Sequence, residues 1–131
     1  KQGKKCDQAQ VRDVDFSPDA EAASAARRFW EVYVEGQPLA EDENPEDFKS
    51  VFNREHYIDQ CGDKETYVKM KSCFRCWAFI TPDGEWHEQG QMGWFGVGDD
   101  TKESRARFTL ELESMLKSSP DLWITIVDCH I

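Results

Sequence analysis

The chain has 131 residues, a length typical of one domain, and a formal net charge of −10 from 26 acidic and 16 basic residues. Eight Phe, five Trp and three Tyr residues can build a hydrophobic core, which argues against wholesale disorder. No apolar run approaches the roughly 20 residues of a membrane-spanning helix, so we expect no integral membrane protein. The excess of acidic residues argues against direct binding to nucleic-acid phosphates.

Five cysteines, an odd number, exclude a framework in which every cysteine is paired within the chain. The sequence also shows no secretion-signal pattern and no Asn-x-Ser/Thr glycosylation site. These features suit a reducing compartment, and we therefore expect a cytoplasmic protein.

The first predicted helix begins at a capping sequence. Ser17 can accept a hydrogen bond from the helix backbone, Pro18 suits the first turn, and Gly36 can end the helix. Apolar residues recur at helical spacing between these positions. We therefore predict a helix over 18–35.

Three shorter helical segments are predicted after a loop over 36–44. Asn44 followed by Pro45 repeats the combination of a cap and a proline at a helix start. Gly62 can end the second segment, and Asp63 can cap the third.

The C-terminal half is predicted as strand, strand, helix, strand. Apolar segments predict strands over 73–80 and 122–127, and a helix is predicted over 102–117. The turn sequence over 81–84, Thr-Pro-Asp-Gly, would join the first strand to an antiparallel strand over 85–88. Right-handed crossover then favours one three-stranded sheet with 73–80 in the middle.

Together these elements predict an α+β fold, with N-terminal helices packed on a small antiparallel sheet. Half of a ferredoxin-like fold is the nearest analogy for the β-β-α-β half. Because polar residues dominate the first fifteen positions, we predict a flexible arm over 1–15 and a single domain over 16–131.

Cys73 and Cys76 form a CxxC sequence, which in zinc proteins supplies half of a metal site. The residues that could complete such a site are His87, Cys129, His130 and Cys61. On a strand, however, Cys73 and Cys76 would point to opposite faces and could not share a metal. We therefore expect no metal and no cofactor, and a small Cys/His metal-binding module is kept as an alternative.

Residue types used in catalysis occur together near the C-terminus. On a strand, Asp128 and His130 would share one face, and a carboxylate can orient an imidazole. Cys129 would point the other way, which excludes a thiol–imidazole pair. An enzyme using His130 and Asp128 is a second alternative, but we predict a protein without catalytic residues.

The most unusual feature is an acidic run. From Glu31 to Phe48 the chain has seven acidic residues and no Lys or Arg. Clustered carboxylates can form an interaction surface for a basic partner, and neighbouring aromatic residues can supply an apolar anchor. The predicted partner-binding residues are Glu41, Asp42, Glu43, Glu46, Asp47, Trp94 and Phe95.

The segment over 79–96, which contains TPDGEWHEQGQMGWFG, and the ending IVDCHI over 126–131 resemble small uncharacterised proteins of bacterial phages and prophages. The resemblance extends over residues 57–131. It implies an accessory protein of a mobile element that acts inside a bacterial cell, and it implies no catalytic residue.

These observations lead to one functional hypothesis. We predict a non-enzymatic acidic binding protein that engages or inhibits a basic host protein, one that handles nucleic acid or acts in defence. We expect no direct contact with nucleic acid or with a membrane.

Overall fold

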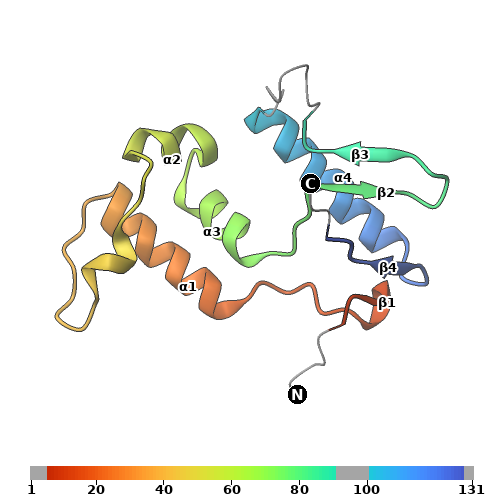
Figure 1. Cartoon of the computed structure of the whole chain (residues 1–131), viewed down its shortest axis with the longest axis horizontal. Helices are drawn as coiled ribbons and strands as arrows, with labels where there is room; N and C mark the ends of the chain where they lie inside the picture. Colours follow the sequence, from red (N-terminus) through yellow and green to blue (C-terminus); the bar gives the residue numbers. More distant parts are fainter. Residues whose placement is uncertain (1–5, 91–100, 129–131) are drawn as a thin grey trace. The chain divides into compact units, whose positions relative to one another are not determined.

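The computed structural model describes residues 6–90 and 101–128, and it confirms an α+β fold (Figure 1). Contacts divide the chain into two compact units. The helical unit is Phe16–Cys76, and the mixed unit combines Lys1–Asp15 with Trp77–Ile131. This division was not expected from the sequence, from which we predicted a single domain over 16–131. The predicted packing of the helices on a sheet concerns both units and stays a prediction.

The helical unit contains three α-helices and two shorter helical segments. α1 (Ala20–Phe29) continues directly into a π-helical segment, η2 (Trp30–Val34), and a 3-10 turn follows at η3 (Pro45–Phe48). α2 (Arg54–Cys61) and α3 (Lys64–Ser72) complete the unit. The order and approximate bounds of these segments agree with the sequence analysis. No helix of the described residues is long and apolar enough to cross a membrane.

Polar side chains cap the helices of this unit. Asp19, rather than the expected Ser17, accepts a hydrogen bond from the backbone N–H of Ala22 at the start of α1. Asp63 accepts the backbone N–H of Thr66 at the start of α3, as predicted. These caps satisfy backbone donors that a helix leaves without partners at its first turn.

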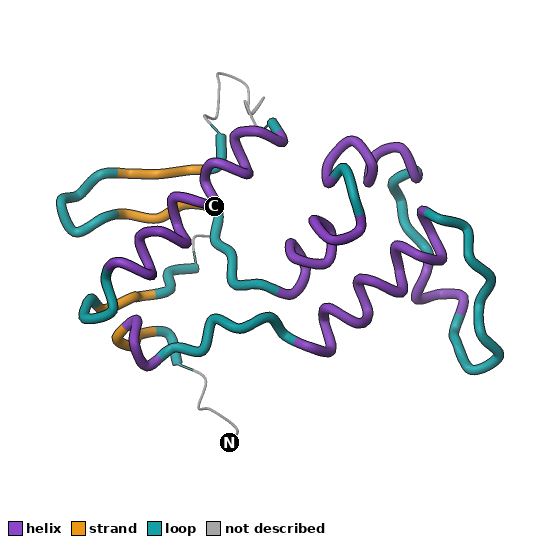
Figure 2. The backbone as a smooth tube through the Cα atoms, turned by 180° about the vertical axis from the view of Figure 1, so that it is seen from behind, coloured by secondary structure: helices purple, strands orange, loops and turns teal. Residues whose placement is uncertain are grey.

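The core of the helical unit lies between α1 with η2 on one side and α2 with α3 on the other. α1 and α3 run side by side in both views (Figures 1 and 2). Trp30 and Tyr67 meet at a ring-centroid distance of 5.5 Å, and Phe29 stacks on Tyr67 at 5.9 Å. The buried residues of the cluster are Ala26, Trp30, Val34, Cys61, Tyr67 and Val68.

In its described residues, the mixed unit contains four short strands and the longest helix. β1 (Gln8–Gln10) comes first, and β2 (Ala78–Ile80), β3 (Trp86–Glu88), α4 (Lys102–Ser118) and β4 (Trp123–Thr125) follow. The strand, strand, helix, strand order of the C-terminal half is therefore confirmed. The strands are shorter than predicted.

The predicted three-stranded sheet is wrong. Among the described residues β2 pairs with β3 alone, and β4 pairs antiparallel with β1, with Ala9 opposite Ile124 (Figure 2). The backbone N–H of Val11 also donates to the carbonyl oxygen of Leu122 at 2.9 Å. The crossover rule fails here because a strand outside the C-terminal half supplies the partner of β4.

The prediction of a flexible arm over 1–15 is corrected for residues 8–13, where the chain forms regular structure. Residues 8–10 form β1, and the 3-10 turn η1 (Val11–Asp13) follows with a buried Val11. Gln8 Nε2 donates to Thr125 Oγ1 across the β1–β4 pair at 3.1 Å. Polar residues here make cross-strand hydrogen bonds, so their polarity does not indicate a free arm.

The turn between β2 and β3 confirms its sequence signal. Gly84 has a φ of 85°, in the left-handed region that glycine adopts without strain. The backbone N–H of Gly84 donates to the carbonyl oxygen of Thr81 at 2.8 Å. Ile80 and Trp86 are consequently paired across the hairpin.

α4 packs one of its faces against this hairpin. Phe108 is 3% exposed and its ring lies 5.3 Å from that of Phe79. Thr101 caps the helix and forms a reciprocal capping box with Ser104.

Candidate functional site

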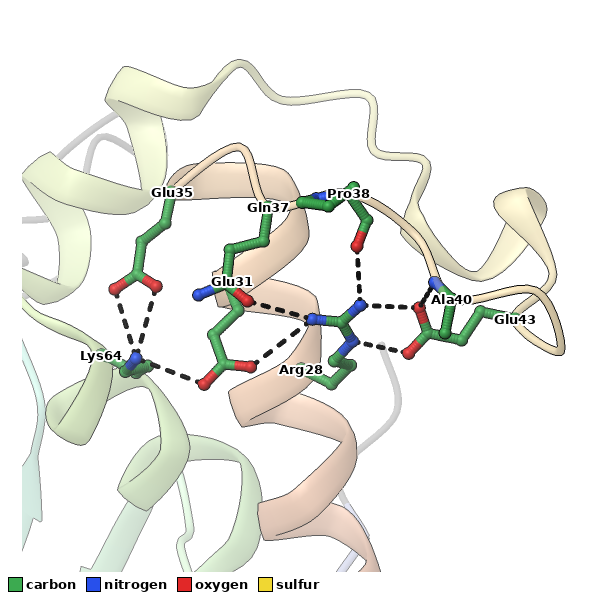
Figure 3. Close-up of polar contacts among 8 residues, drawn as sticks. All are labelled: Arg28, Glu31, Glu35, Gln37, Pro38, Ala40, Glu43 and Lys64. Atoms are coloured by element: carbon green, nitrogen blue, oxygen red, sulfur yellow. Dashed lines mark hydrogen bonds and ion pairs between the residues drawn. The ribbon is translucent and has the colours of Figure 1, made fainter.

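Residues 37–47, here called the acidic loop, follow η2 and extend into η3. The side chain of Arg28, on α1, donates hydrogen bonds to this loop (Figure 3). Its Nε donates to Glu43 Oε1 at 2.5 Å and its Nη2 to Glu43 Oε2 at 2.8 Å, a two-pronged contact. Nη2 also donates to the carbonyl oxygen of Pro38 at 2.9 Å. One guanidinium thus fixes the loop at two points along its length.

Glu43 also orders the loop from within. Its Oε2 accepts the backbone N–H of Ala40 at 2.9 Å, so this carboxylate joins the loop backbone to Arg28. At the far end of the loop, Asn44 Oδ1 accepts the backbone N–H of Glu46 and caps η3. Glu43 therefore stabilises the loop, and because both of its carboxylate oxygens already accept hydrogen bonds, it is less available to a partner than the other carboxylates.

A second set of ion pairs joins η2 to α3. Lys64 Nζ lies 3.3 Å from a carboxylate oxygen of both Glu31 and Glu35 (Figure 3). Glu31 also lies 3.7 Å from Arg28, so the two cations share this residue. Two acids of the acidic run thus stabilise the helical unit, and neither belongs to the predicted partner-binding residues.

The charge network changes the ionisation of its members. Hydrogen bonds from Arg28 and from the Ala40 backbone lower the pKa of Glu43 to about 2. The hydrogen bond with Glu43 raises the pKa of Arg28 in turn. Burial lowers the pKa of Lys64, but hydrogen bonds with Glu35 and Glu31 outweigh this effect and raise it.

The low pKa of Glu43 predicts that the acidic loop loosens in acid. Because the pKa is depressed in the folded state, the stabilising contact is fully present above the ordinary pKa of 4.5 and is lost as the pH falls toward about 2. In an NMR pH titration, the chemical shift of the Glu43 carboxyl carbon should change with a midpoint near pH 2. In Arg28→Ala it should titrate near the ordinary value.

A matched arginine variant controls this measurement. Arg54 is exposed on α2, so Arg54→Ala should leave the Glu43 titration unchanged. A wild-type titration near the ordinary value, or one that Arg28→Ala does not move, would show that the contact with Arg28 is absent in solution.

The remaining predicted carboxylates of the loop point to solvent. Glu41, Asp42 and Asp47 are exposed, and no Lys or Arg of the described residues pairs with them. Glu46 forms an exposed pair with Lys49 at 2.5 Å, of a kind that contributes little to stability. The loop therefore presents three unpaired carboxylates beside one weakly held pair.

The predicted apolar anchor, Trp94 and Phe95, lies outside the described residues. The structure thus brings together the five acidic members of the predicted site, with Glu43 in a different role from the other four.

The CxxC residues do not lie on a strand, which corrects the sequence analysis. α3 extends to Ser72 and β2 begins at Ala78, so Cys73 and Cys76 belong to the connection between them. Burial raises the pKa of Cys76, which disfavours its thiolate. Within residues 6–90 and 101–128, no three His, Cys, Asp or Glu side chains are grouped so that they could hold a metal.

The alternation argument for a catalytic Asp128 also fails, because β4 ends at Thr125. Asp128 is exposed. Cys129 and His130 are not among the described residues, so their proximity to Asp128 stays a prediction.

Sequence reasoning missed the setting of His87, which it considered only as a candidate ligand of a metal site. The imidazole stacks on Phe79 at 4.7 Å, and its Nδ1 lies 3.5 Å from a carboxylate oxygen of Glu111. Nε2 is buried without a hydrogen bond among the described residues, 3.7 Å from Glu85. A shallow hollow of about 460 Å³ opens beside this ring. The cross-strand register sets His87 opposite Phe79, and alternation within each strand alone does not determine that register.

Comparisons with protein-family models, with curated proteins and with solved structures found no match to this chain. The resemblance to phage and prophage proteins consequently stays a prediction.

Proposed function

We propose that this protein is a non-enzymatic acidic binding module whose acidic loop docks onto a basic surface of a partner protein. One observation carries the proposal. Arg28 and Glu43 hold the loop in place, while Glu41, Asp42 and Asp47 stay exposed without a cation partner in the described part of the chain. A loop that is already ordered loses less conformational entropy when it binds.

The net charge supports the same partner chemistry. A protein with a formal charge of −10 attracts basic surfaces over distance and raises the rate of encounter. Basic surfaces are typical of proteins that bind nucleic-acid phosphates. We therefore place the partner among host proteins that handle nucleic acid or act in defence, in the cytoplasm of a bacterium, where the acidic loop would block or modify their activity.

Charge reversal of the exposed carboxylates tests this function. The variant Glu41→Lys, Asp42→Lys, Asp47→Lys is compared with the wild type, first by capture from bacterial lysate with mass spectrometry and then by association kinetics with the captured protein. We expect the association rate constant to fall about tenfold or more and to lose most of its dependence on salt. Folding should be nearly unchanged, because exposed charges contribute little to stability.

A matched control separates the loop from the overall charge. Asp7→Lys, Asp13→Lys, Asp59→Lys changes the net charge by the same amount at exposed positions outside the loop. This variant should associate much faster than the loop variant. Equal association rates for the two variants would show that the loop is an ordinary solvated surface.

A further inference from the structure

The β2–β3 hairpin of the mixed unit has one face packed against α4. Phe79 and His87 lie opposite each other and stack at 4.7 Å. Phe79 meets Phe108 of α4 at 5.3 Å, and His87 Nδ1 lies 3.5 Å from Glu111 of the same helix. Because successive strand residues point to opposite faces, the neighbours of Phe79 and His87 turn away from α4.

We call Trp77, Ile80, Trp86 and Glu88 the outer hairpin face. Ile80 is paired with Trp86. Trp77 precedes β2, so alternation does not place it, and it is assigned to this face because its ring and that of Trp86 make an edge-to-face contact at 6.1 Å. The exposed fractions are 54% for Trp77, 64% for Ile80 and 53% for Trp86. Three large apolar side chains exposed on one short hairpin are typical of a surface that binds another molecule.

Apart from His87 on the opposite face, the charged residues of the hairpin segment 77–90 are all acidic. Trp86 Nε1 donates to Glu88 Oε2 at 3.1 Å, which holds a carboxylate beside the indole ring. The turn adds Asp83 and Glu85, and residues 77–90 contain no Lys or Arg. An aromatic surface beside fixed carboxylates suits a cation with a flat apolar face.

We infer that the outer hairpin face binds an arginine side chain on a basic segment of a partner protein. The guanidinium stacks on the indole ring of Trp86, Trp77 borders it as the second aromatic wall, and Glu88 accepts its N–H groups. Arginine fits better than lysine, because its planar group stacks on aromatic rings while it donates sideways to a carboxylate. This surface belongs to the mixed unit and does not include the acidic loop, so the inference goes beyond the proposed function.

Charge complementarity decides between this occupant and two others. A second copy of the chain would bring the same three hairpin carboxylates against each other, and each copy carries a net charge of −10. Nucleic acid would bring phosphates to an acidic surface. Both arrangements place like charges together, whereas a basic segment neutralises them.

The test uses NMR of the full chain with two short peptides of defined sequence, one alternating Val with Arg and the other alternating Val with Lys. With the Val–Arg peptide we expect the indole N–H signals of Trp77 and Trp86 to shift, while those of Trp30 and Trp123 stay in place. The Val–Lys peptide should bind several-fold more weakly. Trp86→Ala and Glu88→Gln should each weaken binding of the Val–Arg peptide, the first by about tenfold or more.

Two variants keep the test independent of folding. Trp86→Phe retains an aromatic ring and should retain most of the affinity. Trp123→Ala removes another exposed tryptophan, on β4, and should leave the affinity unchanged. Absence of Val–Arg binding, or binding that Trp86→Ala and Glu88→Gln do not alter, would overturn the inference. Shifts confined to amides 41–47 would also overturn it and would favour the acidic loop alone. Self-association that Trp86→Ala abolishes would assign this face to contacts between copies instead.

Discussion

Replacing Trp30 by alanine is expected to lower the free energy of unfolding of the helical unit by about 3–5 kcal/mol. Trp30 is 4% exposed at the junction of α1 and η2, and its ring meets Tyr67 of α3 at 5.5 Å. Removal of the indole leaves a cavity that helices fixed by caps can only partly close. Since whole domains are stable by only about 5–15 kcal/mol, this loss would be a large fraction of the total. Urea denaturation followed by circular dichroism measures it.

A second tryptophan provides the control. Trp123 lies on β4 and is 64% exposed, so Trp123→Ala should cost less than about 1 kcal/mol. Similar losses for the two variants would contradict the assignment of Trp30 to the core and of Trp123 to the surface.

The helices could be predicted from the sequence because their signals are local. Asn44 with Pro45, Gly62 and Asp63 each act within one helical turn of the element that they begin or end. The first helix is capped by Asp19 instead of the predicted Ser17, which moves its start by two residues and leaves the helix itself as predicted.

The strand pairing could not be predicted in the same way, because it depends on residues far apart in the chain. β1 has the sequence Gln-Ala-Gln, which lacks the branched and aromatic residues that indicate strands, yet it supplies the partner of β4. Such a pairing is decided by tertiary contacts such as that between Gln8 and Thr125. A rule about neighbouring elements therefore placed β4 beside the wrong strand.

The candidate site was predictable in composition but not in its internal pairing. The acidic run contains no Lys or Arg of its own, so its cations come from outside it: Arg28 just before the run, Lys49 just after it and Lys64 from α3. Arg28 and Glu31 are three residues apart on one helix, and this spacing could have indicated their contact. The contact between Arg28 and Glu43 depends on how the loop returns over α1, which spacing alone does not determine. The exposed carboxylates are consequently a subset of those that the sequence suggested.

Replacing Phe108 by alanine should destabilise the mixed unit by about 3–5 kcal/mol. Phe108 is 3% exposed on α4, and its ring contact with Phe79 joins the helix to the β2–β3 hairpin. The other buried residues described in this unit are few, chiefly Val11 and Leu112, so less apolar surface remains to compensate for the cavity. Hydrogen exchange measured residue by residue should show faster exchange in α4 and in both strand pairs.

A neighbouring leucine tests the physical reason for this effect. Leu110 lies two residues along α4 and is 65% exposed, so Leu110→Ala removes apolar atoms from the same helix without opening a cavity. Because leucine and alanine are both strong helix formers, that variant should change stability by no more than about 0.5 kcal/mol. If Leu110→Ala accelerated exchange as much as Phe108→Ala, the helix would be sensitive to any loss of side chain rather than to its contact with Phe79. If neither variant changed the rates of hydrogen exchange, the β2–β3 hairpin would not depend on α4 for its stability. The contact with α4 would then not be what orders the outer hairpin face.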